Sequence, residues 1–244
     1  EKIRHGIINI DTGMSRLGLD NGELRRFTLN PKIAEGVNIT YFMSHLSCGD
    51  NRMDYQNEQQ RHLFDKYTLP FTPVKLSLSN SAGIFLGDKF HYDLVRPGAA
   101  IYGLQPIRKE INKVEQVIEL KAKIIQTFFV GANATVGYGA TFRTTRKSRL
   151  ATVSIGYGDG YFRALSNRGH GYIGQTKVPI VGRISMDLIT FDVTDVAEKD
   201  SGLGAMIELI GPNYTVDQLA MDAGTIGYEI LTSLGSRYYR NYVG

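Results

Sequence analysis

The stretch TVGYGATFRTTRKSRLATVSIGYGDGYFR, residues 135–163, contains two tyrosines that each stand between two glycines. Tyr138 and Tyr157 occupy these positions, on either side of the apolar segment 150–155. Glycine lets the backbone approach a ligand closely. The pattern therefore has two interpretations. It forms either two tight turns with surface tyrosines, or two phenols that meet in a cleft, where one titrates and the other holds a ligand.

The composition is typical of a globular protein, with 42% hydrophobic and 21% charged residues among 244. That length allows one large or two medium domains. The net charge of +4 comes from scattered basic residues, which favours a small anionic ligand over a nucleic-acid surface. A single cysteine, Cys48, excludes an internal disulfide and fits a reducing compartment, so we expect a cytoplasmic protein. No apolar run reaches the roughly 20 residues of a membrane helix.

In the part of the chain that precedes this stretch, predicted strands alternate with predicted helices. The strands are expected at 5–10, 37–46 and 74–79, and the helices at 22–35 and 55–67. Polar segments follow the strands, where a (β/α) barrel builds its active site. Three to four such units are half of a (β/α)8 barrel, which has about 250 residues. Residues 1–112 are therefore predicted to be the C-terminal half of a (β/α)8 TIM-type barrel.

The remainder of the chain, residues 113–244, is predicted to be an antiparallel β domain, so the fold class is α/β plus all-β. Its expected strands lie between glycine-rich turns, at 117–130, 151–155, 178–181, 188–193 and 205–210. Thr215 is the expected N-cap of a helix. A second helix is expected at 226–234 and a last strand at 237–242.

Several polar residues at the predicted strand ends have two interpretations each. Asn80 and Ser81, with Gly98, form either simple turns or a phosphate cradle of hydroxyl and amide groups. Arg96 makes a salt bridge at the barrel rim, or donates to a heterocycle nitrogen and keeps it unprotonated. His45 is either a hydrogen-bonded core histidine or a ring stacked on a cofactor. No zinc-ligand spacing, P-loop or dinucleotide fingerprint is present.

With these residues in view, the chain resembles alanine racemase, a family of enzymes that depend on pyridoxal 5'-phosphate (PLP). The resemblance rests on DTGMSRLG at 11–18 and on further segments at 80–82, 96–98, 137–139, 156–160, 181–187 and 225–229. These segments occur in the same order as in the family, and the match runs from His5 to Tyr242. It implies a PLP-binding barrel joined to a β domain, working as a homodimer with shared active sites. It also implies interconversion of L- and D-alanine, with the D form supplied to peptidoglycan synthesis.

The resemblance implies three catalytic residues. Tyr138 is one base and reaches the active site of the partner subunit. Arg96 pairs with the pyridine nitrogen, and His45 stacks near the ring within an Arg96–Tyr138 hydrogen-bond network. A tyrosine has a normal pKa of about 10, so it needs positive charge nearby to act near neutrality.

The resemblance also implies the binding residues. The groups that bind the cofactor are Asn80, Ser81, the amides of Gly98 and Ala99, and the hydroxyl of Tyr228. Arg16 and the amide of Met186, the latter from the partner subunit, hold the substrate carboxylate, and Tyr138 and Tyr157 also bind the substrate. Tyr157 and Tyr228 narrow the entrance, whose outer ring matches Asp50, Arg163, Arg183 and Ile226.

The sequence departs from the family pattern in two places. Many members carry a carboxylated lysine where Asn9 stands, and it orients the arginine that matches Arg16. Asparagine offers only an amide, so an anion such as chloride is a candidate for the vacant negative position. The second departure is the lysine that binds PLP covalently, because no segment like VKANAYGHG occurs here.

From these departures we expect the C-terminal two thirds of a racemase, inactive alone; the N-terminal half of the same protein is either a separate or cleaved piece, or it is disordered or omitted. A half barrel has unpaired strand edges and an exposed apolar interior. Two other functions stay open. One is a PLP-dependent amino-acid decarboxylase, a class that shares this plan but uses cysteine where Tyr138 stands. The other is a non-catalytic fragment that binds PLP or dimerises.

Overall fold

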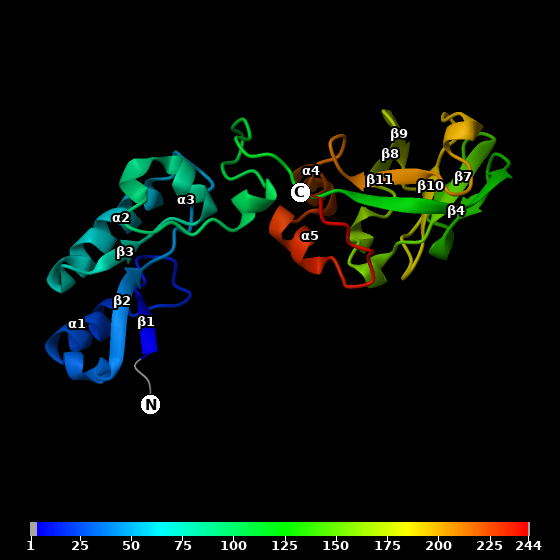
Figure 1. The fold of residues 1–244 in the computed structure, drawn as a ribbon. Helices are drawn as coiled ribbons and strands as arrows, with labels where there is room; N and C mark the ends of the chain where they lie inside the picture. The colour runs from blue at the N-terminus through cyan, green and yellow to red at the C-terminus, as the bar shows by residue number, and fades with distance from the viewer. Residues whose placement is uncertain (1–3, 244) are drawn as a thin grey trace. The chain divides into compact units, whose positions relative to one another are not determined.

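The structure is a computed structural model that describes residues 4–243. The chain divides into two compact units, Glu1–Glu115 and Gln116–Gly244. Each unit has its own sheet and its own helices (Figure 1). No helix in the described range is long and apolar enough to cross a membrane.

The first unit is built on three parallel strands in the order β1-β2-β3. Their bounds are β1 Arg4–Asn9, β2 Val37–Met43 and β3 Lys75–Ser77. The helices are α1 Asn21–Leu29, α2 Tyr55–Thr68 and α3 Ser81–Leu86. Strand and helix alternate along the chain, so the predicted α/β class of this part is confirmed.

Side-chain caps set where these helices begin. Asp20 and Glu23 form a capping box at the start of α1. Asp54 caps α2 by accepting the N–H of Gln56 at 3.0 Å. The helix predicted over 22–35 ends earlier, at Leu29, because a 3-10 turn containing a proline follows.

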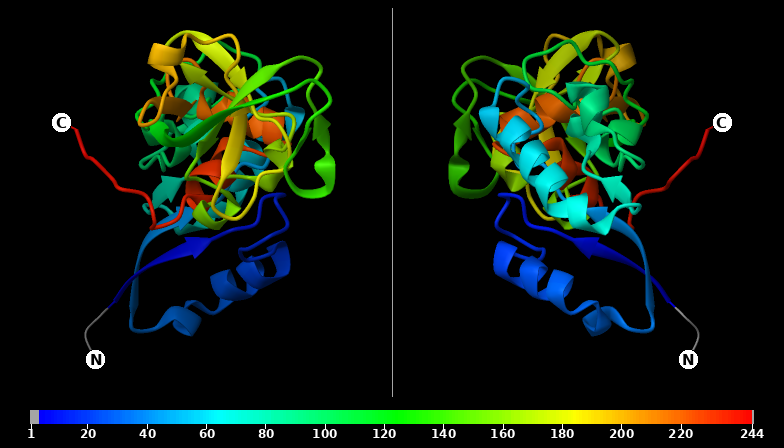
Figure 2. Two further views of the ribbon diagram at one scale, coloured as in Figure 1. Left: turned by 90° about the vertical axis from the view of Figure 1, so that its right-hand side faces the viewer. Right: turned by 90° about the vertical axis from the view of Figure 1, so that its left-hand side faces the viewer.

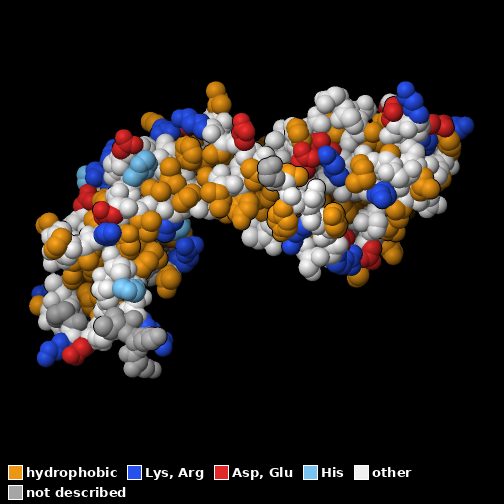
Figure 3. Space-filling view, in the orientation of Figure 1, with side chains coloured by type: hydrophobic (Ala, Val, Ile, Leu, Met, Phe, Trp, Pro, Cys, Tyr) orange, Lys and Arg blue, Asp and Glu red, His pale blue; other side chains and the backbone are white. Residues whose placement is uncertain are grey.

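The core of the first unit lies between the helices and the sheet. Helix α1 lies next to β1 and β2 (Figure 2), and its Leu24 and Phe27 belong to the core cluster that contains Phe42 of β2. Phe42 of β2 stacks on Phe71, with ring centroids 4.6 Å apart. Other hydrophobic side chains stay exposed, such as Ile7 at 51%, and Figure 3 shows hydrophobic side chains gathered on the visible face of this unit.

The second unit is an antiparallel β structure, as predicted. Six strands pair in the order β10-β7-β4-β11-β8-β9, and β5 and β6 form a separate ribbon. An antiparallel bridge joins Ile180, just after β9, to Phe191 of β10, so the six-stranded sheet closes into a barrel. The strands are β4 Leu120–Val130, β5 Thr135–Val136, β6 Phe142–Arg143, β7 Ser148–Val153, β8 His170–Ile173, β9 Thr176–Pro179, β10 Ile189–Asp192 and β11 Met206–Ile210.

Two helices complete the second unit, α4 Val216–Ala223 and α5 Gly227–Ser233. The predicted N-cap is confirmed. The Thr215 hydroxyl accepts the N–H of Gln218 at 3.2 Å, and the Gln218 side chain accepts the N–H of Thr215 at 2.9 Å. This reciprocal pair fixes the first residue of α4.

Two predictions for the second unit differ from the structure. The strand expected at 237–242 is wrong, because the backbone there pairs with no other strand and Arg237 instead binds two aspartates. Strand β8 was not predicted, because glycines interrupt its apolar pattern. Gly171 is required inside it, since a Cβ there would lie 2.5 Å from Cγ2 of Ile207.

Candidate active site

A buried glutamine of α2 ties together the loops that follow β1 and β2. The Gln60 amide nitrogen donates to Thr12 Oγ1 at 3.2 Å and to the His45 carbonyl at 2.8 Å. Its oxygen accepts the N–H of Ser47 at 2.8 Å. The hydroxyls of Thr12 and Ser44 lie 2.7 Å apart in the same network. Sequence reasoning missed Gln60, although its place four residues before the core residue Phe64 was a usable signal.

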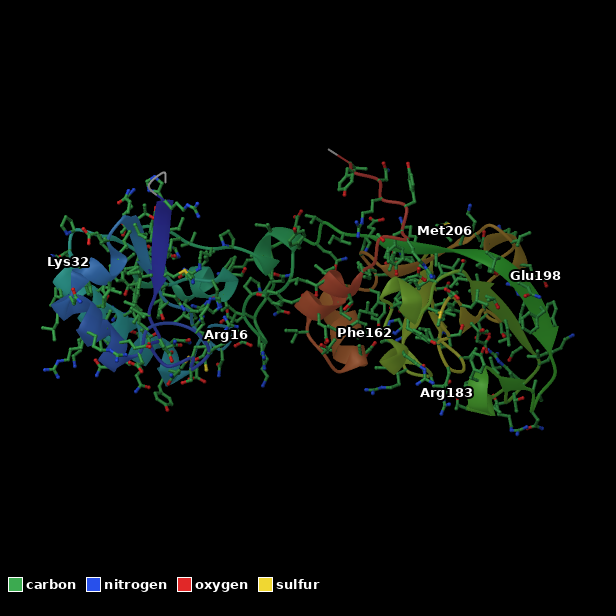
Figure 4. All side chains as sticks on the ribbon, turned by 90° about the horizontal axis from the view of Figure 1, so that it is seen from below. Arg16, Lys32, Phe162, Arg183, Glu198 and Met206 are labelled. Carbon is green, nitrogen blue, oxygen red and sulfur yellow. The ribbon has the colours of Figure 1, made fainter. Side chains whose placement is uncertain are left out.

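Asp11 shapes the loop after β1. One of its carboxylate oxygens accepts the backbone N–H groups of Gly13, Met14 and Ser15 at 2.9–3.0 Å. These bonds, that of Gly13 first, hold the pKa of Asp11 below its usual value. The loop presents Arg16, which is exposed and labelled in Figure 4.

Asn9 precedes this loop and has a buried acceptor without a partner. Its amide nitrogen donates to the Leu17 carbonyl at 2.6 Å, which fixes the orientation of the amide. Its oxygen is buried and makes no hydrogen bond within residues 4–243. An orphaned oxygen calls for a donor such as a guanidinium, whereas an anion would need the nitrogen. This geometry counts against chloride beside Asn9.

Arg96 reaches the carboxyl ends of β2 and β3. Its Nη2 donates to the carbonyls of Ser44 at 2.7 Å and Leu78 at 3.3 Å, and its Nη1 binds the hydroxyl of Ser77. No carboxylate in the described part of the chain lies within ion-pair distance of it, so the rim salt bridge is not formed. Burial lowers the pKa of Arg96.

His45 lies between two hydrogen-bond donors. Nη2 of Arg96 is 3.5 Å from Nδ1 of His45, and Nδ2 of Asn80 is 3.2 Å from Nε2. The orientation of Asn80 is fixed, because its oxygen accepts the N–H of Gly83 at 2.9 Å. Burial first, and then the charge of Arg96, lower the pKa of His45. A neutral imidazole can accept from only one of these donors, and burial beside Arg96 disfavours protonation of both ring nitrogens.

Ser81, Gly98 and Ala99 gather where a phosphate cradle was considered. The Ser81 hydroxyl accepts the N–H of Gly98 at 2.8 Å and that of Ala100 at 3.2 Å. Its own proton is therefore free for an outside acceptor. The space where Gly98 would carry a Cβ is open, and Ala99 begins a 3-10 turn over Ala99–Tyr102. Open space beside a hydroxyl and backbone amides fits a phosphate group.

In the second unit, glycine-rich turns meet at one edge and expose the two tyrosines. Tyr138 is 72% exposed, Tyr157 42% and Met186 54%. The turn of Tyr157 is joined to Met186, since the N–H of Gly158 donates to the Met186 carbonyl at 2.8 Å. The turn of Tyr138 lies against Arg183, which Figure 4 places on the opposite side of this unit from Met206.

The other predicted residues divide between the units. Arg163 is exposed at the start of a 3-10 turn, Arg163–Leu165. Ile226 is the N-cap of α5, and Tyr228 lies exposed in its first turn. Asp50 belongs to the first unit, where it pairs with Arg108, a partner that sequence reasoning missed.

A parallel βα unit with a phosphate-type cradle, followed by a β barrel with exposed tyrosines, defines a two-domain protein of the barrel-plus-β-domain class. The family model "Alanine racemase, N-terminal domain" matches residues 3–106, and "Alanine racemase, C-terminal domain" matches residues 117–242. The chain belongs to the alanine racemase family, and the resemblance read from the sequence is confirmed.

Curated relatives named alanine racemase cover nearly the whole chain. The protein of Rickettsia bellii is 45% identical over 236 residues, which are 96% of this chain and 58% of the relative. The protein of Rhodospirillum rubrum is 44% identical over 237 residues, 97% of this chain and 63% of the relative. The chain therefore spans about three fifths of the length of these relatives.

Solved structures give the same result. Alanine racemase from Bartonella henselae, determined with covalently bound pyridoxal phosphate, has a TM-score of 0.93 and 45% identity. The match covers 98% of this chain and 66% of that structure. The biosynthetic alanine racemase from Pseudomonas aeruginosa has a TM-score of 0.91 at 32% identity, covering 100% of this chain and 68% of that one.

Proposed function

We propose that this chain is the larger part of a PLP-dependent alanine racemase, an isomerase that interconverts L- and D-alanine and supplies D-alanine for peptidoglycan. The observation that carries the proposal is the environment of Arg96. This residue is a half-buried guanidinium without a carboxylate partner among the described residues, it lies beside His45, and its neighbouring strand end carries the Ser81–Gly98 cradle.

The residues of the first unit fit PLP. The Ser81 hydroxyl and the amides of Gly98 and Ala99 would hold the phosphate, together with the hydroxyl of Tyr228, and the Gly98 N–H would exchange its present bond to Ser81 for one to the phosphate. Asn80 shapes this site by capping α3 and contacting His45. When bound, PLP supplies the electron sink that makes the α-proton of alanine removable.

Arg96 and His45 set the charge at the site. The guanidinium would stay protonated and, with PLP bound, would donate to the pyridine nitrogen, which would disfavour protonation of that nitrogen. His45 is held neutral and accepts from Arg96 at Nδ1. It links this arginine to Tyr138 of the partner subunit, and the positive charge favours the phenolate form of Tyr138, the base for one face of the substrate.

Arg16 and the Met186 amide hold the substrate carboxylate, the latter from the partner subunit. Tyr157 and Tyr228 narrow the entrance, and Asp50, Arg163, Arg183 and Ile226 form its outer ring. The exposure of Tyr138, Tyr157 and Met186 supports a homodimer in which a second copy covers them. Asn9 offers its orphaned oxygen to Arg16 in place of a carboxylated lysine.

The second base is a lysine from a segment outside these 244 residues. In this proposal residues 1–112 are the second half of a (β/α)8 barrel and residues 113–244 the β domain, while the first half carries the lysine. Coverage of 58–66% of the relatives supports this division. The proposed location is the cytoplasm.

The test uses the full-length protein that contains this chain, with D-alanine formation from L-alanine as the assay. Tyr138→Phe removes one base and lowers kcat by about 10²- to 10⁴-fold, the usual contribution of general acid–base catalysis. The control is Tyr55→Phe, an exposed tyrosine of α2. Absence of racemisation in the unaltered protein, with PLP bound, would overturn the proposal.

A further inference from the structure

The side chain of Arg237 joins two loops of the second unit. Its Nε donates to Oδ1 of Asp159 at 2.7 Å, and its Nη2 donates to Oδ1 of Asp187 at 2.6 Å. The two aspartates lie 78 and 50 residues before it in the sequence. Asp159 is 5% exposed, so a buried carboxylate anchors one arm of this contact.

The first arm controls the turn that carries Tyr157. The second oxygen of Asp159 accepts the N–H of Gly156 at 2.9 Å, so this carboxylate both closes the turn and binds Arg237. The end of α5 packs against the same turn, since a Cβ on Gly160 would lie 1.8 Å from the Ser233 carbonyl oxygen. Phe162, just after the turn, lies beside α5 in Figure 4.

The second arm controls the loop that carries Met186. Asp187 directly follows Met186, and this loop also pairs with the turn through the backbone. The N–H of Tyr157 donates to the Ser185 carbonyl at 3.0 Å. The approach of the two loops is so close that a Cβ on Gly156 would lie 2.3 Å from the Met186 carbonyl oxygen.

The side chains at the ends of these loops are only partly covered within this unit. Tyr157 and Met186 are 42% and 54% exposed, so their placement depends largely on the backbone of the two loops. A planar guanidinium holds two carboxylates at a set distance and angle, which a lysine ammonium cannot do. The hydrogen bonds that Arg237 donates to Asp159 and Asp187 raise its pKa, so it stays charged at any physiological pH.

We propose that Arg237 is a positioning residue that holds Tyr157 and Met186 in the arrangement needed to bind the carboxylate of a small amino acid. This inference rests on the proposed function for the identity of the substrate. Arg237 lies in the segment 237–242, where the sequence predicted a strand. The predicted contacts to substrate belong to Tyr157 and the Met186 amide, and Arg237 acts only through them.

The test compares Arg237→Gln with Arg237→Lys in the full-length protein. A displacement of about 1 Å in a binding group costs up to about 10²-fold. We expect Arg237→Gln to raise the KM for alanine by about 10- to 100-fold with a smaller change in kcat, and Arg237→Lys to recover part of this loss. Hydrogen exchange of the amides at 156–158 and 185–187 is expected to become faster, with the rest of the barrel unchanged.

A matched control is Arg146→Ala, which removes an exposed arginine paired with Asp195 elsewhere in this unit. If Arg237→Gln does not fold, Asp187→Ala keeps the ion pair between buried Asp159 and exposed Arg237 and is expected to raise KM and exchange at 185–187. Unchanged KM and exchange in these variants would overturn the proposal. If hydrogen exchange at these loops rises in a protein that has no racemase activity, the positioning role of Arg237 is retained and only the proposed function is rejected.

Discussion

Replacing Gln60 by leucine tests the buried network beneath the candidate site. The side chain is fully buried, and its removal leaves the His45 carbonyl and the Ser47 N–H without their partner. An orphaned buried polar group costs about 1–3 kcal/mol, so Gln60→Leu should lower the free energy of unfolding by about 3 kcal/mol. For a chain of this size that is a fall in Tm of roughly 6–12 °C.

The assay is differential scanning calorimetry of the full-length protein, with Gln59→Leu as the control. Gln59 is the neighbouring residue of α2 and is exposed, so the same change there tests the effect of adding a leucine. Thr12 and Ser44 still bind each other in both variants. A melting temperature of Gln60→Leu equal to that of Gln59→Leu would refute the assigned role of the network.

The remaining predictions concern charge and backbone. Because the pKa of His45 is lowered from 6.5, nitrogen NMR should show that its ring is still neutral just below pH 6.5. The contribution of His45 to stability is complete above pH 6.5 and declines as the pH falls below that value. Asp11 has a pKa below 3.8, so its stabilisation of the loop is complete above that pH and is lost only as the pH falls through the folded value; a carbon NMR midpoint at or above 3.8 would contradict this. Arg96→Glu should raise transamination relative to racemisation, measured as pyruvate against D-alanine, because the pyridine nitrogen could then protonate. Gly160→Ala should lower the stability measured by urea unfolding by more than about 1 kcal/mol, since φ is +90° and the Ser233 carbonyl blocks a Cβ.

The sequence predicted the elements whose signals are local. Helix α4 begins where Thr215 places it, and strands β1 to β3 alternate with helices as their hydrophobic patterns indicate. Motif positions also brought Ser81 and Gly98 together correctly, because Ser81 follows β3 and Gly98 follows Arg96, which forms a parallel bridge to Asn80.

The residues that sequence reasoning missed act over long separations. Gln60 joins loops that lie 48 and 15 residues before it, at Thr12 and His45. Arg237 depends on two aspartates in other turns, and no periodic pattern marks such a set. Strand β8 was hidden because Gly171 is selected by close packing against Ile207, not by strand propensity.

The bridge between Ile180 and Phe191 has a consequence for how this family can diversify. A closed barrel presents no long free strand edge to neighbouring chains, and its stability comes from the inward-facing residues of the six strands. The exposed side chains on the turns of its rim therefore carry little of the folding energy. Under the proposed function, substitutions at Tyr157, Arg183 or Met186 would alter the substrate entrance while the barrel stays intact, so the rim is the place to begin when changing substrate choice by design.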